Sequence, residues 1–141
     1  MDDTARIDAA CGLVNAIGNS DWQGVAALLA ENFRYIELGT GRTLDGPQAF
    51  IDAMSGWKGA FPDVRGTLTN VMASGQTVAV ELVWAGTHEG ALEGLGRTID
   101  ATGIHQSTAA ALFVVFDDDR ITETRQYFDM VGLYEQIGAL P

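Results

Sequence analysis

The sequence predicts a single α+β domain, and three observations support this prediction. Apolar residues recur at helical spacing through much of the first 60 residues. From about residue 64 onward, β-prone runs alternate with turn signals, an order typical of a meander of neighbouring strands rather than of parallel βαβ units. The chain has 141 residues, of which 47% are hydrophobic and 19% are charged, and these values fit one folded domain with one core.

Three helices are expected in the first half of the chain. Residues 4–18 have an amphipathic pattern that Gly18 and Asn19 end. Ser20 followed by Gln23 has the form of a capping box, which predicts a second short helix. A third helix is expected to begin near residues 45–48, because Pro47 suits a first helical turn, and to end before residues 61–63.

The second half of the chain is expected to be mostly sheet. Residues 64–73 and 77–85 read as strands joined by a hairpin at Ser74-Gly75-Gln76, and a shorter strand is expected near Phe33. Two more strands, about 106–116 and 120–128, meet at an acidic turn, and residues 130–138 predict a closing helix. Residues 86–103 hold five of the 17 glycines, which favours a mobile rim.

Charge and cysteine content exclude several partners and sites. The chain has 8 Lys and Arg residues against 19 Asp and Glu, and its formal charge of -11 repels nucleic acid and anionic lipid headgroups. Cys11 is the only cysteine, so neither an intrachain disulfide nor a multi-cysteine metal site can form. We find no signal-peptide pattern and no run of 18 apolar residues, and we therefore expect a cytoplasmic protein with no membrane partner.

The sequence lacks the common catalytic motifs. It has no Walker loop, no Gly-x-Ser-x-Gly elbow and no His-Glu-x-x-His helix, and the glycines of residues 90–96 do not have dinucleotide-binding spacing. The three aspartates at 117–119 fit a solvated hairpin tip better than a calcium loop. His88 and His105 are the only histidines, too few for a zinc site without carboxylate ligands. We expect no cofactor and no metal ion.

Strand alternation indicates which polar side chains face a pocket. In the last strand, Gln126 shares a face with Thr124 and Phe128, and a glutamine on a core-facing side is unusual. In the strand that starts at residue 77, Trp84 shares a face with Leu82, which makes Trp84 a candidate pocket wall.

Tyr35 and Glu37 also lie on one side of their strand. If that side is inward, Glu37 is a candidate base. Otherwise Glu37 lies at the pocket mouth, either solvated or paired with Arg34 or Arg42.

Several short motifs occur in order along the chain. They are Phe61-Pro62-Asp63, Trp84-Ala85-Gly86-Thr87-His88-Glu89-Gly90, Thr102-Gly103, Asp119-Arg120-Ile121-Thr122-Glu123, Arg125-Gln126-Tyr127-Phe128-Asp129 and Leu133-Tyr134-Glu135-Gln136-Ile137-Gly138. Together they resemble the SnoaL-like polyketide cyclase family over nearly the whole chain. The resemblance implies the cone-shaped fold of nuclear transport factor 2, ketosteroid isomerases and limonene epoxide hydrolases. In that fold a curved antiparallel sheet wraps around N-terminal helices, encloses one apolar pocket and often forms dimers.

The chain departs from this family at the positions that carry chemistry. The aspartate that acts as general acid/base in aldol cyclisation corresponds to Gln126, which cannot transfer that proton. The family histidine corresponds to Leu112 and a pocket asparagine to Glu37. The Asp-Arg-Asp set of the epoxide hydrolases falls on Trp84, Leu82 and Gln126, which nearly excludes their chemistry.

Two classes of function follow. In the first, a cofactor-independent cyclase or isomerase acts on a hydrophobic carbonyl compound: Glu37, its pKa raised by an apolar wall, removes a proton, and Tyr35 or Gln126 hydrogen-bonds the developing enolate. In the second, the pocket binds a small molecule, or serves the structure, without chemistry.

The candidate substrate-binding residues are Trp84, Trp57, Leu82, Leu112, Phe128, His88 and His105. For His88 the alternative is a hydrogen bond that fixes its loop. Strand alternation from Leu112 places His105 outward, unless a bulge reverses it. We also expect a homodimer, because the outward sheet face has a mixed composition. That face carries Glu81, Val83, Phe113, Val115, Arg125 and Tyr127.

Overall fold

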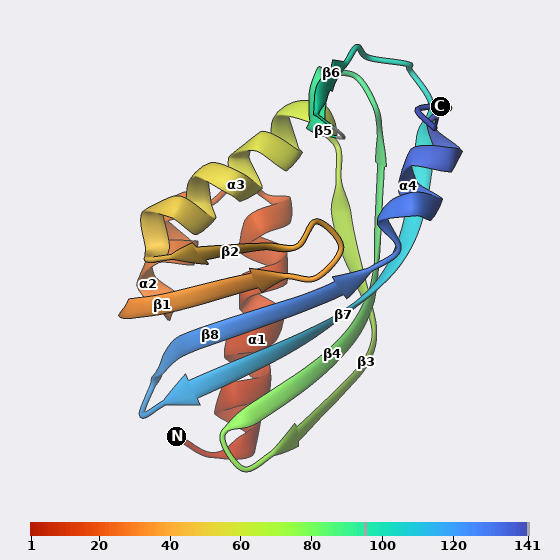
Figure 1. The fold of residues 1–141 in the computed structure, drawn as a ribbon. Coiled ribbons are helices and arrows are strands. Elements are labelled where there is room, and N and C mark those ends of the chain that lie inside the picture. Colours follow the sequence, from red (N-terminus) through yellow and green to blue (C-terminus); the bar gives the residue numbers. More distant parts are fainter. Residues whose placement is uncertain (95, 141) are drawn as a thin grey trace.

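The computed structural model describes residues 1–94 and 96–140. A curved six-stranded sheet forms one layer, and three helices pack against it (Figure 1). The helices are α1 (Asp3–Gly18), α2 (Trp22–Leu28) and α3 (Pro47–Ala60), and a fourth, α4 (Met130–Gln136), lies at the far end of the sheet. The α+β class predicted from the sequence is confirmed.

The sheet has the strand order β2-β1-β8-β7-β4-β3. Its strands are β1 (Leu29–Glu37), β2 (Arg42–Asp45), β3 (Arg65–Ser74), β4 (Thr77–Thr87), β7 (His105–Asp117) and β8 (Arg120–Phe128). A separate two-stranded hairpin, β5 (Leu92–Gly94) with β6 (Arg97–Ile99), forms inside the glycine-rich segment that we predicted as a rim.

The sheet is mixed, whereas the sequence led us to expect antiparallel strands only. Strands β1 and β8 pair in parallel, and the other neighbours in the sheet are antiparallel. The parallel pair joins the first and last strands of the chain, and α3 and the β3–β7 strands lie between them in sequence. Pattern analysis finds local hairpins but carries no signal for a pairing over this distance.

Local details at two turns differ from the prediction. The cap of α2 is Asp21, whose Oδ1 accepts a hydrogen bond from Gly24 N at 2.9 Å, so the predicted Ser20 capping box is wrong. Ser20 instead adopts a positive φ of 53° in the turn after α1. Strand β2 was not predicted, because its four residues have no apolar alternation.

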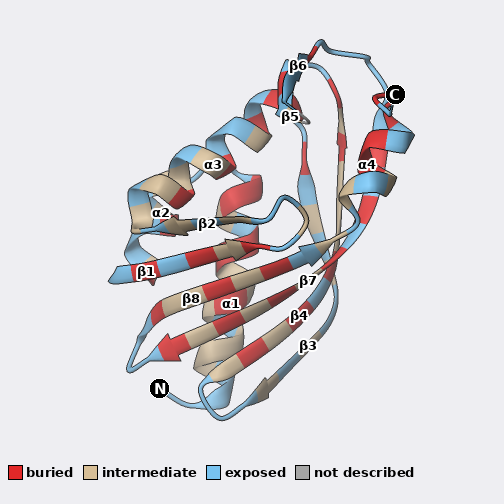
Figure 2. Ribbon diagram, viewed as in Figure 1, coloured by how far each residue is buried: buried red, intermediate tan, exposed pale blue. Residues whose placement is uncertain are grey.

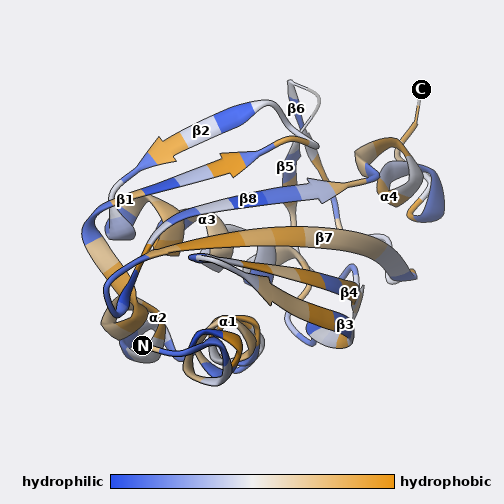
Figure 3. Ribbon diagram, turned by 90° about the horizontal axis from the view of Figure 1, so that it is seen from below, coloured by the Kyte–Doolittle hydropathy of each residue, from blue (hydrophilic) through white to orange (hydrophobic). Residues whose placement is uncertain are grey.

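The strands alternate between buried and more exposed residues, as the sequence predicts (Figure 2). The main core fills the space between the concave sheet and α1 to α3, and Figure 3 shows hydrophobic residues along β7 across the middle of the sheet. A second core cluster joins the end of α3 to β5, β6 and α4. Within the described part of the chain, none of the helices has the length and hydrophobicity needed to cross a membrane.

Candidate functional site

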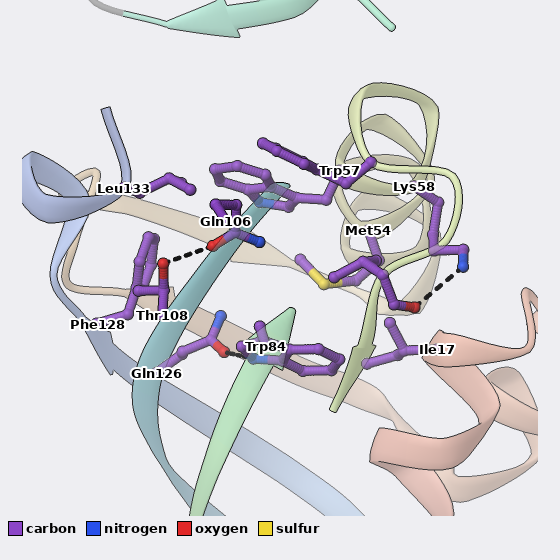
Figure 4. A pocket seen from close by; sticks show the side chains of 12 residues that line it. Ile17, Met54, Trp57, Lys58, Trp84, Gln106, Thr108, Gln126, Phe128 and Leu133 are labelled. Carbon is purple, nitrogen blue, oxygen red and sulfur yellow. Dashed lines mark hydrogen bonds between the residues drawn. The ribbon is translucent and has the colours of Figure 1, made fainter. Parts of the chain in front are cut away.

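An inner cavity of about 70 Å³ lies between the helices and the sheet (Figure 4). Most of its wall is apolar. The lining residues are Ile17, Met54, Trp57, Lys58, Phe61, Val64, Trp84, Gln106, Thr108, Gln126, Phe128 and Leu133. An apolar wall with a few placed polar groups is the usual composition of a small-molecule site.

Gln126 is held in one orientation by two neighbours. Its Oε1 accepts a hydrogen bond from Trp84 Nε1 at 2.8 Å, and its Nε2 donates to the Tyr35 hydroxyl at 2.7 Å. An indole N–H can only donate, so the amide oxygen must face Trp84. The carboxamide has a second N–H besides the one given to Tyr35, and the nitrogen is turned toward the cavity in Figure 4.

Tyr35 and Glu37 extend the hydrogen-bond network of Gln126 away from the cavity. The Tyr35 hydroxyl donates to Glu37 Oε2 at 2.7 Å, and Arg42 Nε donates to Glu37 Oε1 at 2.7 Å. Burial, followed by the charge of Glu37, raises the pKa of Tyr35 well above its ordinary value, so Tyr35 stays a neutral donor. Five residues from Arg42 to Trp84 therefore form one connected network through Gln126.

Of the two positions left open for Glu37, the structure shows the inward one, but Glu37 does not line the inner cavity. Its side chain is fully buried and accepts hydrogen bonds from Tyr35, Thr40, Arg42 and Trp57. The solvated alternative is therefore wrong, and of the two candidate partners Arg42 forms the ion pair, while Arg34 pairs with Asp45. With both oxygens occupied, Glu37 is placed to orient Tyr35 rather than to meet a ligand.

Gln106 is a second amide in the cavity wall, and it was missed by the sequence analysis. It is 3% exposed, and its Oε1 accepts a hydrogen bond from Thr108 Oγ1 at 2.6 Å. Gln136 Nε2 lies 3.4 Å from the same hydroxyl oxygen, so Thr108 accepts from one glutamine and donates to the other. The period-2 alternation that places Leu112 inward also places Gln106 and Thr108 inward, and this signal could have found them.

Lys58 lines the cavity with its aliphatic stem and uses its ammonium group structurally. Its Nζ donates to three backbone carbonyls, those of Gly18 and Pro62 at 2.9 Å and that of Val64 at 3.2 Å. Desolvation, followed by the nearby charge of Arg65, lowers the pKa of Lys58. All three of its N–H donors have acceptors, so Lys58 joins the end of α1 to the α3–β3 connection.

The other predicted binding residues fall into two groups. Trp57, Trp84 and Phe128 line the inner cavity. Leu82 and Leu112 are buried in the core beneath it.

The two histidines lie outside the cavity lining. His88 is fully buried, its Nδ1 accepts a hydrogen bond from Thr102 N at 3.2 Å, and its ring packs on Phe61. The loop-fixing alternative for His88 thus describes the contacts that it makes. His105 is exposed and contacts the Thr87 hydroxyl at 3.1 Å, which confirms the outward orientation expected from strand alternation.

A larger outer cleft of about 570 Å³ lies beyond Trp57. It is bounded by α3, by the turn between β1 and β2, by β5 and by α4. Trp57 lines both spaces and therefore forms the partition between them. The sequence analysis predicted one pocket and did not predict this cleft.

The family model of the SnoaL-like polyketide cyclases matches residues 8–137. The chain belongs to the SnoaL-like polyketide cyclase family. No curated protein matches the chain in sequence.

Solved structures show the same fold. A candidate SnoaL-like polyketide cyclase from Jannaschia sp. CCS1 superposes with a TM-score of 0.86 at 20% identity, covering 99% of this chain and 95% of that one. IdmH, a candidate polyketide cyclase from Streptomyces antibioticus, gives 0.80 at 24% identity over 94% and 98% of the two chains. An epoxide hydrolase of M. tuberculosis described as LEH-like gives 0.74 at 21% identity over 96% and 90%.

In this SnoaL-like protein, Glu37, Gln126 and Leu112 lie side by side in the sheet. Gln126 is paired with Glu37 on β1 and with Leu112 on β7, and Leu112 is paired with Val80 on β4. One row across the centre of the sheet therefore carries Glu37, Gln126 and Leu112, the three positions at which the sequence analysis expects a departure from the cyclase residues.

Proposed function

We propose that the inner cavity binds the carbonyl-bearing end of a flat hydrophobic compound and promotes its cyclisation or isomerisation without a cofactor. The orientation of Gln126 supports this proposal more than any other observation. Trp84 holds its oxygen and Tyr35 accepts one of its N–H groups, and the second N–H is left for a ligand oxygen. Trp57, Phe61 and Phe128 supply an aromatic wall for a flat ring.

The proposed chemistry is stabilisation of an enolate. A CH group between two carbonyls loses its proton to water, and the negative charge develops on the oxygen that accepts from Gln126. In a cyclisation, the enolate carbon then bonds to a second carbonyl carbon, whose oxygen takes a proton from water. In an isomerisation, the proton returns to a different carbon. Tyr35 and Glu37 act through Gln126, as positioning residues.

The dimensions of the cavity restrict what enters it. Its volume of about 70 Å³ is smaller than the roughly 150 Å³ of an engineered cavity that holds one benzene ring. Binding therefore requires the side chains at its mouth to move. Met54 is placed to do so, because its side chain is unbranched and flexible.

The second candidate function is binding without chemistry. Its support is the cavity lining, which contains no carboxylate and no imidazole among the residues that the structure describes. A site of this kind would retain the ligand through the aromatic wall and Gln126 alone. Ligand affinity without turnover would identify it.

The experiment that tests the main proposal compares wild type with Gln126→Leu and with Gln23→Leu, an exposed control on α2. Calorimetry with an anthrone and an anthraquinone measures affinity, and mass spectrometry of a reactive β-diketone measures turnover. We expect Gln126→Leu to weaken binding about five-fold and to abolish turnover, since one hydrogen bond is lost. Equal behaviour of the two variants would contradict the proposal. Gain of cyclase activity in Gln126→Asp would identify the missing acid/base as the change that separates this chain from its family.

We also propose a homodimer. The outward sheet face contains Phe113 with its ring centroid 5.9 Å from that of Tyr127 and 5.5 Å from the Arg125 guanidinium carbon, a half-exposed group of aromatic and charged side chains. Mass measurement in solution tests this, and a monomer at micromolar concentration would contradict it. A cytoplasmic location stays a prediction from the sequence.

A further inference from the structure

The outer cleft is large enough to hold part of a ligand, whereas the inner cavity is much smaller. Its volume of about 570 Å³ lies within the roughly 300–1,000 Å³ typical of small-molecule sites. Its lining also has a different chemistry. Thr40, Arg42, Asp52, Glu93 and Tyr134 bring hydrogen-bond donors and acceptors to its wall, in contrast to the apolar wall of the inner cavity.

Tyr134 provides a hydroxyl at the cleft. The residue is 2% exposed and lines the cleft wall. The hydroxyl lies against Gly94, where an added Cβ would come within 1.9 Å of the oxygen. A glycine at position 94 therefore leaves the space that the Tyr134 hydroxyl occupies. A phenol hydroxyl in the wall of a cleft can donate to, and accept from, a polar group of a ligand.

Arg42 supplies further donors from the opposite side. Its Nε and one terminal nitrogen face Glu37, and its side chain is 39% exposed beside the cleft. Asp52 and Glu93 supply acceptors, and each of them is also an acceptor for a neighbouring side chain, Gln48 for Asp52 and Thr98 for Glu93. Because Glu37 neutralises the charge of Arg42, the two exposed carboxylates give the cleft a net negative charge.

We propose that the outer cleft binds a neutral hydroxylated ring, such as a sugar, attached to the flat compound. Hydroxyl groups both donate and accept, which matches a cleft where Tyr134 and Arg42 donate and Asp52 and Glu93 accept. The indole of Trp57 supplies an apolar surface for the ring. The net negative charge disfavours phosphate, sulfate or carboxylate substituents. This inference rests on the proposed function, because the ring is attached to the compound that the inner cavity holds, and it adds the class of substituent that the outer cleft binds.

The experiment measures the affinity of an anthraquinone and of its O-glucoside by calorimetry. We expect wild type to bind the glucoside about ten-fold more tightly than the aglycone, and Tyr134→Phe to reduce that preference about five-fold by removing one hydrogen bond. Asp52→Asn and Gly94→Ala are expected to reduce it as well. The matched control is Asp8→Asn on α1, which is exposed and should keep the full preference. Circular dichroism confirms that each variant is folded.

The outcomes separate this inference from the proposed function. Equal affinity for glucoside and aglycone, or an unchanged preference in Tyr134→Phe, would overturn the inference and leave the inner site untouched. Binding of the glucoside alone, weakened by Tyr134→Phe, would support the outer cleft and contradict the inner site. If neither compound binds, both proposals fail.

Discussion

The indole N–H of Trp84 and the amide oxygen of Gln126 form a 2.8 Å hydrogen bond that decides which end of the amide faces the ligand. The two residues come from β4 and β8, which are separated in the sheet by β7. The bond therefore reaches over the intervening strand on the concave side. It converts a side chain that could present either an acceptor or a donor into one that presents a donor.

Replacing Trp84 by phenylalanine should release Gln126. Phenylalanine keeps much of the aromatic wall but removes the only donor to the amide oxygen among the described residues, so the amide can rotate. We expect ligand affinity to fall about five-fold, and the free energy of unfolding to fall by about 1 kcal/mol, since a buried acceptor loses its partner. Calorimetry and urea unfolding measure the two effects. Trp22→Phe on α2, away from the cavity lining, is the control, and an equal loss of affinity there would refute this explanation.

Replacing Glu37 by glutamine should destabilise the fold. The change removes the charge that pairs with Arg42 and leaves an amide where Tyr35 and Arg42 both donate. Because Arg42 is partly exposed and can turn to solvent, we expect a loss of about 2 kcal/mol rather than the larger loss of a fully buried pair. Urea unfolding measures it, with Glu31→Gln at an exposed position of the same strand as control. Equal stability of the two variants would show that the ion pair contributes nothing.

The raised pKa of Tyr35 predicts a loss of stability at alkaline pH. The unfolded chain binds fewer protons than the folded one once pH exceeds the ordinary tyrosine pKa of about 10, so stability falls as pH rises above that value. Below it, both states are protonated and the contribution is complete. The difference in unfolding free energy between wild type and Tyr35→Phe should be constant up to about pH 9 and should then shift in favour of the variant. A difference that stays constant to pH 11 would contradict a raised pKa for Tyr35 in the folded protein.

Replacing Gly66 by alanine should disturb the cavity wall. An added Cβ would lie 2.6 Å from Val14 Cγ1 and 3.0 Å from Trp84 Cζ3, so α1 or the indole must shift. We expect a loss of about 2 kcal/mol in unfolding free energy, measured by urea unfolding. In Gly12→Ala, nothing lies within 4 Å of the new atom, and helix propensity predicts a gain of about 0.5 to 1 kcal/mol. Similar effects of the two substitutions would rule out the steric explanation.

Sequence patterns predicted the parts of this protein that depend on local periodicity. The inward faces of Trp84 and Gln126 follow from the alternation of side chains in a strand, and the structure shows both in the cavity wall. The same alternation placed Tyr35 and Glu37 on one side of their strand without deciding which side is inward. Helix bounds were predicted within a few residues, because capping residues and glycines mark them.

The contacts that give the site its chemistry were not predictable in the same way. Glu37 is a base or an ion-pair partner depending on whether Arg42 reaches it, and that depends on β2, an edge strand with no periodic signal. The partition by Trp57 depends on how α3 sits over the sheet. Both are set by tertiary packing rather than by local pattern.

Lys58 has a practical consequence, because it is the only lysine in the chain. Its amine is shared among three carbonyl oxygens in the folded protein. Amine-reactive dyes and crosslinkers should therefore leave Lys58 unlabelled in the folded protein. Labelling of Lys58 would begin only when the junction of α1, α3 and β3 opens. The fraction of labelled Lys58, measured by mass spectrometry, therefore reports that opening.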